Sequence, residues 1–551
     1  MKKFILSNWQ LVLITILSVF IVWPLFVPGY FSHHDDLQVM RIFEMRKCFA
    51  DFQIPCRWVP DMGYGNGYPI FNFYGVFPYY LGTIASFVLG YIGAAKLLFF
   101  LPLILGGIGM YLLSKELFGK IPGFVGGVLY LFAPYRALDS YVRGAVGESF
   151  ALAIVPFVFY FFLKLVKLKD KKYFTLATIS TALLFVSHNI MTLIFTPVVL
   201  SWIIFWLYKE KWMGTRLAIL SLIISFGLAS FFLLPAFMEK RLVQTESLTR
   251  NELDFRAQFV KVSQLFLDRS WNYAGSAPQS ANTISYQIGW PHWWLVALSF
   301  LVVILSKKQK NISLFAFLFL VFTFGVYMTH NKSSFIWESI KILSFVQFPW
   351  RFLSIVIFSG SLLGAYFLTF FRDSKWLKVL SILIVILTVI LNWQYFRPEH
   401  FYKDVTDLSK LSGQNFVDQQ KGSLLDYLPK TALEPRQLPP NTPYVVTGSA
   451  DISYFENRSN SWLFKVVVNK EAQIEVPVFD FPNWRVFVND KEIPHTNKNV
   501  LGRIGFTLPV GEFAVRGRFL NTPIRTFGNI LTIASLLALV LIYAKGRKIF
   551  V

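Results

Sequence analysis

Residues 1–30 read MKKFILSNWQLVLITILSVFIVWPLFVPGY, in which two lysines precede a mostly apolar run. The run is about twenty residues long, which is enough for an α-helix to cross a bilayer. It contains no Ala-x-Ala pattern at which a signal peptide would be cleaved, so we predict a retained membrane span near residues 7–27. Because lysines favour the cytoplasmic side, the residues after this span are expected on the outer face.

The composition extends this reading to the whole chain. Of 551 residues, 55% are hydrophobic and only 15% are charged, which is too apolar for a soluble protein of this size. The net charge of +22 comes from lysines and arginines clustered between apolar runs, as in the cytoplasmic loops of membrane proteins. We therefore predict a polytopic α-helical membrane protein with both termini in the cytoplasm and no nucleic-acid partner.

One apolar run does not fit a regular alternation across the membrane. If FPYYLGTIASFVLG (77–90) crossed the bilayer, the basic stretch KLVKLKDKK (164–172) would lie outside. The run is short, aromatic at its start and punctuated by glycine, so we predict an interfacial or re-entrant helix. About twelve spans then remain, near residues 7–27, 93–114, 121–138, 149–167, 172–187, 189–207, 216–237, 291–306, 311–329, 351–371, 376–393 and 525–544.

Four segments are then expected to share the outer face. Within a membrane module of residues 1–393 they are 28–92, 139–148 and 238–290, and the fourth is the long stretch 394–524. No predicted span carries an ionisable residue in its central turns, which disfavours a solute transporter because transporters place charges at mid-membrane. The activity of the protein is therefore expected on the outer face.

The last outer stretch changes its pattern from about Tyr444 onward. SWLFKVVVN, NWRVFVND and RIGFTLP alternate apolar and polar residues, and turn residues separate them. This predicts an extracytoplasmic antiparallel β-sandwich at 441–523, preceded by a loop-rich tether at 394–440. Residues 524–551 form the last span and a basic cytoplasmic tail. The sandwich could bind carbohydrate or cover the membrane module, and the pattern leaves both open.

The first outer segment begins with SHHDDLQVMRIF (32–43), which places two carboxylates beside the membrane. Asp35 or Asp36 could cap the helix that follows. One carboxylate suffices for a cap, so the other is free to act as a base or a metal ligand. His33 and His34 could bind substrate or a metal. The spacing matches no metal motif, so the metal ligands stay unknown and a divalent cation is the one cofactor left open.

A second polar group lies in APYRALDSYVRGAVGES (133–149), at a short outer link between two spans. Arg136 and Arg143 could anchor the spans at the interface, but anchoring does not explain Asp139 and Glu148. A pair of arginines suits a phosphate. Glu148 begins the next helix and could face the carboxylates of the first outer segment.

Two further polar residues are predicted at the same depth. His188 in FVSHNIM and Arg351 in VQFPWRFL each lie at the outer end of a span. Alone, His188 would be read as a hydrogen-bonded histidine and Arg351 as an arginine of the aromatic belt. Together with the other groups they indicate convergence where the outer leaflet meets water, so both are candidate substrate-binding residues.

The first outer segment continues as CRWVPDMGYGNGYPIFNFYG (56–75), in which rings and glycines alternate. Arg57 and Asp61 with these aromatics suit a groove for a sugar or a lipid headgroup, although interfacial packing explains the rings equally well. The two cysteines of the chain, Cys48 and Cys56, both lie here. They either form a disulfide or stay reduced, and the sequence does not decide between these states.

Several of these segments resemble a known family. HHDDLQVMRI, RWVPDMGYGNGYPIFNFYG, YVRGAVGE, SHN and QFPWRF resemble bacterial membrane proteins known as 6-pyruvoyl-tetrahydropterin synthase-related, close to YfhO-like proteins. FPNWRVFVNDKEIP and LPVGEFAVRGRF are similar to the sandwich that follows such modules. The arrangement resembles the GT-C superfamily of integral membrane glycosyltransferases. The chain lacks the metal-binding histidine set of a soluble pterin synthase, so the pterin name implies no activity.

The resemblance implies a function. GT-C enzymes of this kind move a sugar from a polyprenyl-phosphate-linked donor to an envelope acceptor, here outside the bacterial plasma membrane and with inversion at the sugar. The base would be Asp35 or Asp36, and Glu148 matches the second outer acid better than Asp139. Arg143 and Arg351 would contact the donor phosphate. The Asp-Asp pair departs from the DxD spacing of some relatives, which leaves the choice of base and any metal requirement open. The alternative is a non-enzymatic protein that binds or hands over lipid-linked envelope polymer.

Overall fold

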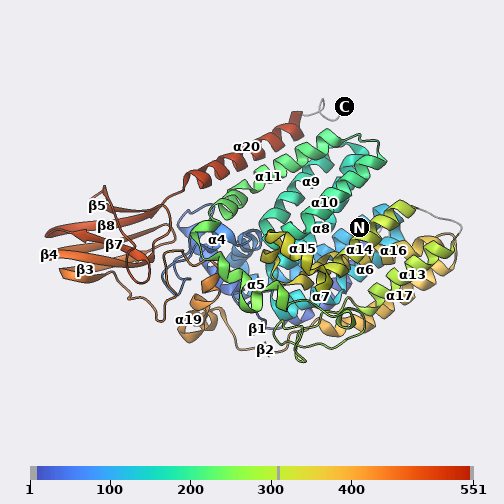
Figure 1. Cartoon of the computed structure of the whole chain (residues 1–551), viewed down its shortest axis with the longest axis horizontal. Coiled ribbons are helices and arrows are strands. Elements are labelled where there is room, and N and C mark those ends of the chain that lie inside the picture. Colours follow the sequence, from blue (N-terminus) through green and yellow to red (C-terminus); the bar gives the residue numbers. More distant parts are fainter. Residues whose placement is uncertain (1–8, 307–310, 546–551) are drawn as a thin grey trace.

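The computed structural model describes residues 9–306 and 311–545. Predicted cytoplasmic lysines and arginines at positions 2–3, 307–310 and 546–548 lie outside these residues. Along the longest axis of the molecule, the C-terminal strands gather at one end, and helices α13 (Trp290–Leu305), α16 (Leu353–Phe367) and α17 (Trp376–Asn392) lie at the other (Figure 1). The protein is therefore a helical body with one β-sheet projecting from one end.

A helix lies near each of the twelve predicted spans, but fewer helices have the length and apolarity to cross a membrane. Among the described residues nine do, and α6 with the bent segment after it would make a tenth. Helices α9 and α13 have 17 and 16 residues. The count of twelve is thus unconfirmed. The main helices are α2 (Trp9–Val22), α5 (Phe77–Phe118), α6 (Lys120–Leu131), α8 (Val146–Leu168), α9 (Lys171–Ser187), α10 (Asn189–Lys209), α11 (Thr215–Met238), α13 (Trp290–Leu305), α14 (Ile312–Thr329), α16 (Leu353–Phe367), α17 (Trp376–Asn392) and α20 (Pro523–Lys545).

Helix α5 is broken where the sequence separates an interfacial helix from a span. Its 42 residues would extend about 63 Å if straight, roughly twice the thickness of a bilayer core. The backbone leaves the helical conformation at Gly90 (φ 68°, ψ 179°), a conformation that glycine adopts readily. Just after the break, the N–H groups of Tyr91 and Ile92 each donate to the carboxylate of Asp407 at 2.8 Å. The tether therefore caps the second half of α5.

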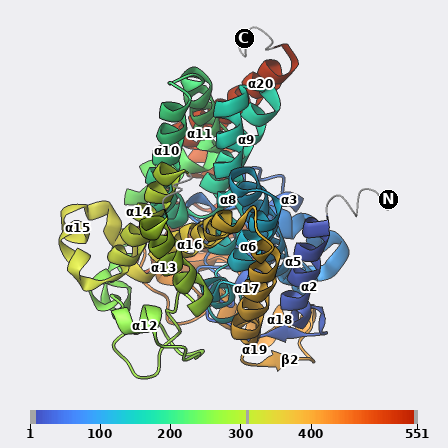
Figure 2. The ribbon, with the colours of Figure 1, turned by 90° about the vertical axis from the view of Figure 1, so that its right-hand side faces the viewer.

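Four helices pack along one side of the helical body. Helices α9, α10, α11 and α20 lie together in both views (Figures 1 and 2). At their ends Lys171 Nζ donates to the Tyr543 carbonyl at 3.2 Å, and Lys169 Nζ lies 3.7 Å from Met213 Sδ. The links after α8 and after α10 and the end of α20, all predicted to be cytoplasmic, thus lie at one level.

Short helices make up the stretches between the long helices. They are α3 (Gln38–Ala50), α4 (Ile70–Phe73), α7 (Pro134–Ala137), η2 (Leu138–Arg143), η3 (Lys240–Leu242), η4 (Thr245–Thr249), η5 (Asn251–Leu253), η6 (Phe255–Ala257), α12 (Val262–Phe266), η7 (Asn331–Ser333), α15 (Ser334–Ser339), η8 (Lys341–Val346), η9 (Pro349–Phe352), α18 (Asp407–Lys410), α19 (Gly413–Lys421) and η12 (Leu424–Asp426). These segments are close-packed rather than loose, because they carry many buried aromatic residues.

The C-terminal strands form one continuous antiparallel sheet in the order β3-β4-β8-β5-β6, with β7 also paired to β4. Its strands are β3 (Tyr444–Asn457), β4 (Ser461–Phe479), β5 (Trp484–Val488), β6 (Lys491–Ile493), β7 (Arg503–Leu508) and β8 (Gly511–Phe519). Phe506 pairs with Ile474, yet its ring centroid lies 6.4 Å from that of Trp462, twelve positions earlier on β4. The sheet therefore folds over on itself, and the two layers of the predicted sandwich come from shared strands.

The sheet rests on the first outer segment. Trp58 is buried and stacks on Phe481 with ring centroids 6.0 Å apart. Arg503 Nε donates to Asn66 Oδ1 at 2.8 Å, and the Asn66 carbonyl accepts from the Phe479 amide at 2.8 Å. These contacts fix the sheet against the membrane module.

The predicted tether, 394–440, consists mostly of loops and short helices, and it packs tightly against the first outer segment. Strand β2 (Phe401–Tyr402) pairs with β1 (Tyr30–Phe31). Farther on, the Tyr68 hydroxyl donates to the Leu424 carbonyl at 2.8 Å and accepts from the Tyr427 amide at 2.7 Å. The tether thereby reaches the place where the outer ends of the spans meet.

Candidate active site

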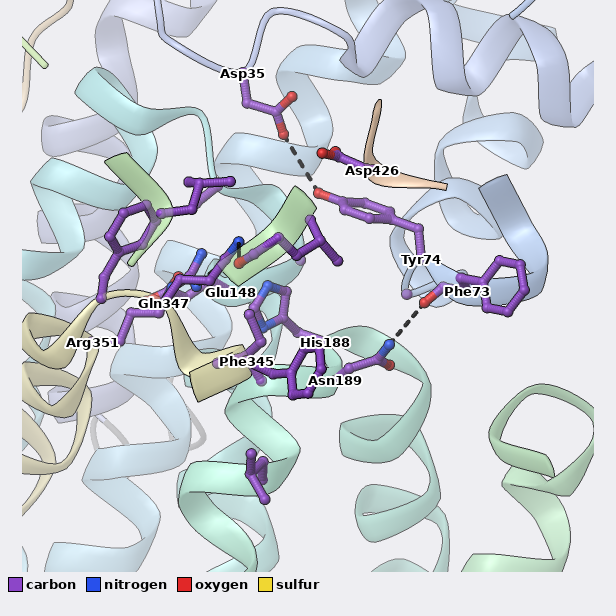
Figure 3. Close-up of a pocket in the computed structure, with 18 of the residues that line it drawn as sticks. Asp35, Phe73, Tyr74, Glu148, His188, Asn189, Phe345, Gln347, Arg351 and Asp426 are labelled. Atoms are coloured by element: carbon purple, nitrogen blue, oxygen red, sulfur yellow. Dashed lines mark hydrogen bonds and ion pairs between the residues drawn. The ribbon is translucent and has the colours of Figure 1, made fainter. Parts of the chain in front are cut away.

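The outer segments surround a cavity of about 580 Å³. Its polar part combines residues from the first outer segment, the starts of α8 and α10, η9 and the tether (Figure 3). The candidate residues that line it are His34, Asp35, Arg143, Glu148, His188 and Arg351. Six of the twelve residues singled out from the sequence therefore meet in one place.

The two adjacent aspartates point to different surroundings. Asp35 lines the cavity, where its Oδ2 accepts from Arg41 NH1 at 2.8 Å and from the Tyr74 hydroxyl at 3.4 Å. Within the described residues no donor reaches Asp35 Oδ1. Asp36 instead forms an ion pair with Lys410 of the tether and does not line the cavity. Asp35 is therefore the carboxylate that can meet a substrate.

The alternative in which one aspartate caps the following helix does not hold. Helix α3 begins at Gln38, and neither carboxylate accepts from its first N–H groups. Asp35 instead forms an ion pair with Arg41, which lies about one turn inside that helix. Both carboxylates are thus engaged in ion pairs, one toward the cavity and one toward the tether.

Backbone hydrogen bonds join the first outer segment to the second. The amides of His34 and Asp35 donate to the carbonyls of Val142 and Arg143, both at 2.9 Å. The chain then turns at Gly144 (φ 69°), where a Cβ atom would lie 2.1 Å from the His33 ring. Only glycine fits at this turn.

Glu148 is the centre of a buried charge cluster. Its carboxylate accepts from the Tyr135 hydroxyl, lies 2.9 Å from Arg143 NH1, and lies 3.4 Å from Arg351 Nε. Arg143 also pairs with Asp139. Each arginine thus has an acidic partner, so neither is a free cation.

The arginines of this cluster are also fixed by neighbours other than acids. Arg351 NH1 donates to the Val346 carbonyl at 2.7 Å and to Gln347 Oε1 at 2.9 Å. The Arg143 guanidinium lies 4.7 Å from the centre of the Trp350 ring. The cluster is therefore preorganised before any ligand binds.

His188 enters the cavity as a neutral group. Its Nδ1 accepts from the Met191 amide at 3.2 Å and so caps α10, which leaves the proton on Nε2. Burial lowers the pKa of His188 to about 3, with the nearby guanidiniums adding to the effect and Glu148 opposing it. The ring can donate one hydrogen bond to a bound group.

Other candidate residues have structural contacts outside the cavity. His33 is buried among rings and its Nδ1 lies 3.1 Å from the Phe31 carbonyl. Arg57 binds Asn72, Asn529 and the Phe231 carbonyl, Asp61 pairs with Lys47, Arg136 donates to the Pro102 carbonyl at 2.6 Å, and Asp139 holds Arg143. These contacts tie the outer segments and helices together rather than facing a substrate.

Sequence reasoning missed several residues that face the cavity. Arg41 and Tyr74 were hidden in stretches read as a helix and an aromatic loop. Asp426 comes from the tether, and burial raises its pKa to about 6. Lys240 follows the end of α11 and lies over the Phe345 ring, 3.1 Å from its centre. Within the described residues Lys240 has no carboxylate partner, so it is the unpaired cation of the cavity lining.

The remaining wall of the cavity is apolar. It is formed by Leu193 of α10, Leu233 and Phe237 of α11, and Ile342 and Phe345 of η8. The Phe237 side chain is 71% exposed. Since α10 and α11 are long and apolar enough to cross a membrane, we expect this wall to face lipid.

Two open questions about the first outer segment and metals can be addressed. Cys48 and Cys56 form a disulfide. No group of three or more His, Cys, Asp or Glu side chains within residues 9–306 and 311–545 could hold a metal ion. His33 and His34 each lie within hydrogen-bond distance of a backbone carbonyl, and His34 Nε2 lies 2.9 Å from that of Tyr273.

Residues 71–398 match the model of a family described as the 6-pyruvoyl-tetrahydropterin synthase related domain, a membrane protein. The chain belongs to this family. In this 6-pyruvoyl-tetrahydropterin synthase related protein, Glu148 and Arg351 lie within the matched residues, whereas Asp35 and Asp426 lie outside them. The cavity thus joins the family domain to segments before and after it.

Other proteins are similar over part of their length. An uncharacterized protein of Lactococcus lactis subsp. cremoris (strain MG1363) is 25% identical over 247 residues, covering 42% of this chain and 40% of that protein. Mycobacterial arabinofuranosyltransferase AftD has a TM-score of 0.48 and 13% identity, over 72% of this chain and 27% of AftD. ArnT from Cupriavidus metallidurans, bound to undecaprenyl phosphate, has a TM-score of 0.37 and 11% identity, over 66% of this chain and 60% of ArnT. The Archaeoglobus fulgidus oligosaccharyltransferase has a TM-score of 0.43 and 16% identity, over 72% of this chain and 54% of that chain.

All three solved structures have TM-scores below 0.5 and identities of 16% or less. The chain spans less than two thirds of the length of each of these relatives. At these scores the similarity concerns part of a fold and says nothing about a donor, an acceptor or a reaction.

Proposed function

We propose that the protein is an inverting glycosyltransferase that moves a sugar from a polyprenyl-phosphate-linked donor to a hydroxyl of an envelope acceptor. The reaction would take place outside the bacterial plasma membrane. One observation carries the proposal: a single cavity combines a carboxylate with a free oxygen, an unpaired lysine and an apolar wall toward lipid. These are the three features that such a donor and such a reaction require.

The donor would enter along the apolar wall. Its isoprenoid chain would lie against Phe237, Leu193 and Ile342, and its phosphate would bind near Lys240. Arg143 and Arg351 were the phosphate contacts expected from the sequence, but both are already paired with Glu148. An unpaired cation interacts more strongly with an added anion than one whose charge is already balanced.

Asp35 would be the base. Its free Oδ1 accepts the proton of the acceptor hydroxyl while the hydroxyl oxygen attacks the anomeric carbon of the sugar. The bond from that carbon to the phosphate oxygen breaks in the same step, and the polyprenyl phosphate leaves. A single displacement inverts the configuration at the sugar. Arg41 and Tyr74 would hold Oδ2 and so aim Oδ1 into the cavity.

The Glu148 cluster would position groups around the sugar. It fixes Arg351 and Arg143 at one side of the cavity, and His188 offers its Nε2 proton beside them. A sugar has several hydroxyl groups that such donors bind. Glu148 is fully buried and its carboxylate is engaged by Tyr135 and both arginines, so its role would be positioning.

The test is mass spectrometry of the lipids that co-purify with the protein. Wild type and a Lys341→Gln control are expected to retain polyprenyl phosphate or its glycosylated form. Lys341 is exposed on η8 and does not line the cavity. Lys240→Gln is expected to retain roughly tenfold less, because a hydrogen bond to a charged group contributes about 1.5–3 kcal/mol. Bulk phospholipid alone in all three proteins would refute the donor assignment.

A second comparison separates catalysis from simple binding. Asp35→Asn should retain the donor with its sugar still attached, because transfer stops when the base is removed. Asp36→Asn should resemble wild type, since its carboxylate faces Lys410 instead. If Asp35→Asn leaves the ratio of glycosylated to free lipid unchanged, the protein instead binds or hands over lipid-linked polymer.

A further inference from the structure

A second cavity, of about 1010 Å³, lies next to the first. The two cavities share Asp426 and Leu253 in their walls. The second cavity is formed between residues 244–253, which follow α11, and residues 425–433 of the tether. Anything that passes between Leu253 and Asp426 would enter the polar part of the first cavity.

The segment 245–253 lies between the two cavities and lines both of them. Thr245 and Leu248 line the first cavity, whereas Glu246 and Arg250 line the second. The Leu248 carbonyl also accepts from Gln347 Nε2 at 3.0 Å, which links this segment to the neighbour of Arg351. One short segment thus contacts the candidate active site on one side and the second cavity on the other.

Hydrogen bonds hold the two walls of the second cavity together. Gln244 Nε2 donates to the carbonyls of Pro429 and Ala432 at 3.1 and 2.7 Å. Ser247 Oγ donates to the Leu425 carbonyl at 2.8 Å. The Glu246–Lys430 ion pair, at 2.6 Å, adds a contact between exposed side chains. The cavity is therefore a fixed feature of the fold.

The linings of the two cavities differ in chemistry. The described lining of the second cavity contains no aromatic residue and carries five charged side chains: Glu246, Arg250, Glu252, Asp426 and Lys430. Three acids and two bases nearly balance, so the lining does not favour an anion. Charged and polar groups bind hydroxyl groups well and are a poor surface for an isoprenoid chain.

We propose that the second cavity is the entrance for the acceptor, a water-soluble compound that carries hydroxyl groups and arrives from the aqueous side. This inference rests on the proposed function and adds the path and chemical class of the acceptor. Donor and acceptor enter along different walls, and the acceptor hydroxyl passes Leu253 and Asp426 to reach Asp35. Asp426 accepts a hydrogen bond from a hydroxyl group of the incoming compound and so positions it.

The first experiment measures access in lipid nanodiscs with a trimethylammonium methanethiosulfonate reagent, which is cationic and water-soluble. Leu253→Cys reports on the shared wall and Leu193→Cys on the apolar wall; both native cysteines are in the disulfide and do not compete. Leu253→Cys is expected to react roughly tenfold faster, because thiol labelling depends on access to water. Added undecaprenyl phosphate should protect Leu193→Cys and leave Leu253→Cys reactive.

Tryptophan substitutions then close the entrance. Ser247→Trp and Thr431→Trp fill the second cavity from its two walls, and Thr249→Trp is the control because Thr249 lies on the same segment and lines neither cavity. Each filled variant should slow labelling of Leu253→Cys, and the control should not. Because the two tryptophans lie on different walls, the test still holds if one of the two variants misfolds.

The second experiment measures the lipid that co-purifies with the same tryptophan variants. A closed acceptor entrance leaves the donor bound and unused, so the ratio of glycosylated to free polyprenyl phosphate should rise several-fold over the control. A plug that blocks labelling but leaves this ratio unchanged overturns the inference, as does labelling that neither plug slows. If even wild type and control lack polyprenyl lipid, the proposed function has failed first, and the two failures are thereby distinguished.

Discussion

Glu148→Gln tests whether the buried charge cluster organises the cavity. The substitution keeps the size of the side chain but removes the charge between Arg143 and Arg351, at 2.9 and 3.4 Å. Arg143 retains Asp139 as a partner. Arg351 has no other acidic partner among the described residues, so its buried guanidinium would lose its counter-charge.

The expected cost follows from these distances. At an effective dielectric constant of about 20, each contact near 3 Å has a Coulomb energy of roughly 5 kcal/mol. Desolvation of the three groups offsets much of this attraction, but removing one partner leaves a buried charge uncompensated. We therefore expect the free energy of unfolding to fall by about 3–5 kcal/mol.

The assay is equilibrium unfolding in mixed micelles of SDS and a mild detergent. Glu116→Gln is the matched control, since Glu116 pairs with Lys164 at 3.2 Å and both side chains are partly exposed. That change should cost no more than about 1 kcal/mol. A double variant with Arg351→Gln removes both charges and should recover part of the loss. The reasoning is refuted if Glu148→Gln costs no more than the control, or if the double variant loses the sum of both single changes.

Three further predictions concern other features of the fold. Cys48→Ser should lower the free energy of unfolding by about 2–3 kcal/mol, because the disulfide removes the entropy of closing so short a loop in the unfolded chain. A reducing agent should destabilise wild type to the same extent and leave the variant unchanged. Burial raises the pKa of Asp426 to about 6, with Arg41 opposing the shift, so the folded state binds a proton more tightly than the unfolded chain. Wild-type stability should therefore decrease by up to about 3 kcal/mol as pH rises from about 4 to 6, and Asp426→Asn, followed by unfolding at several pH values, should lack this decrease. Asp407→Ala removes the acceptor for two amides at the break in α5; it should cost about 1–2 kcal/mol and speed proteolysis near Gly90, while the same change at the exposed Asp404 should do neither.

The sequence could indicate the convergence of the span ends because each of these residues adjoins an apolar run. Asp35, Glu148, His188 and Arg351 all follow or precede a predicted span on the same side, and the structure brings them to one cavity. Periodicity and charge suffice for such placement, since the membrane fixes the depth of each span end. Which neighbouring aspartate faces inward depends on the backbone bonds to Val142 and Arg143, and no local pattern reveals these.

Asp426 and Lys240 could not be found in the same way. Neither residue belongs to a periodic segment, and their positions depend on contacts between parts of the chain far apart in sequence. Asp426 reaches the cavity because the tether packs on Tyr68 and β1. Arg57 and Asp61 show the converse, because their residue types suit a substrate groove while their partners make them structural.

The packing of the tether has a consequence for dividing the chain into exchangeable modules. Pairing of β2 with β1, the cap that Asp407 provides, and Asp426 itself all come from residues beyond the predicted end of the membrane module at 393. A chimaera joined at residue 394 would therefore separate these contacts from the segments that need them. The natural joint for exchanging the C-terminal sheet lies between Leu433, the last tether residue that lines a cavity, and the start of β3 at Tyr444.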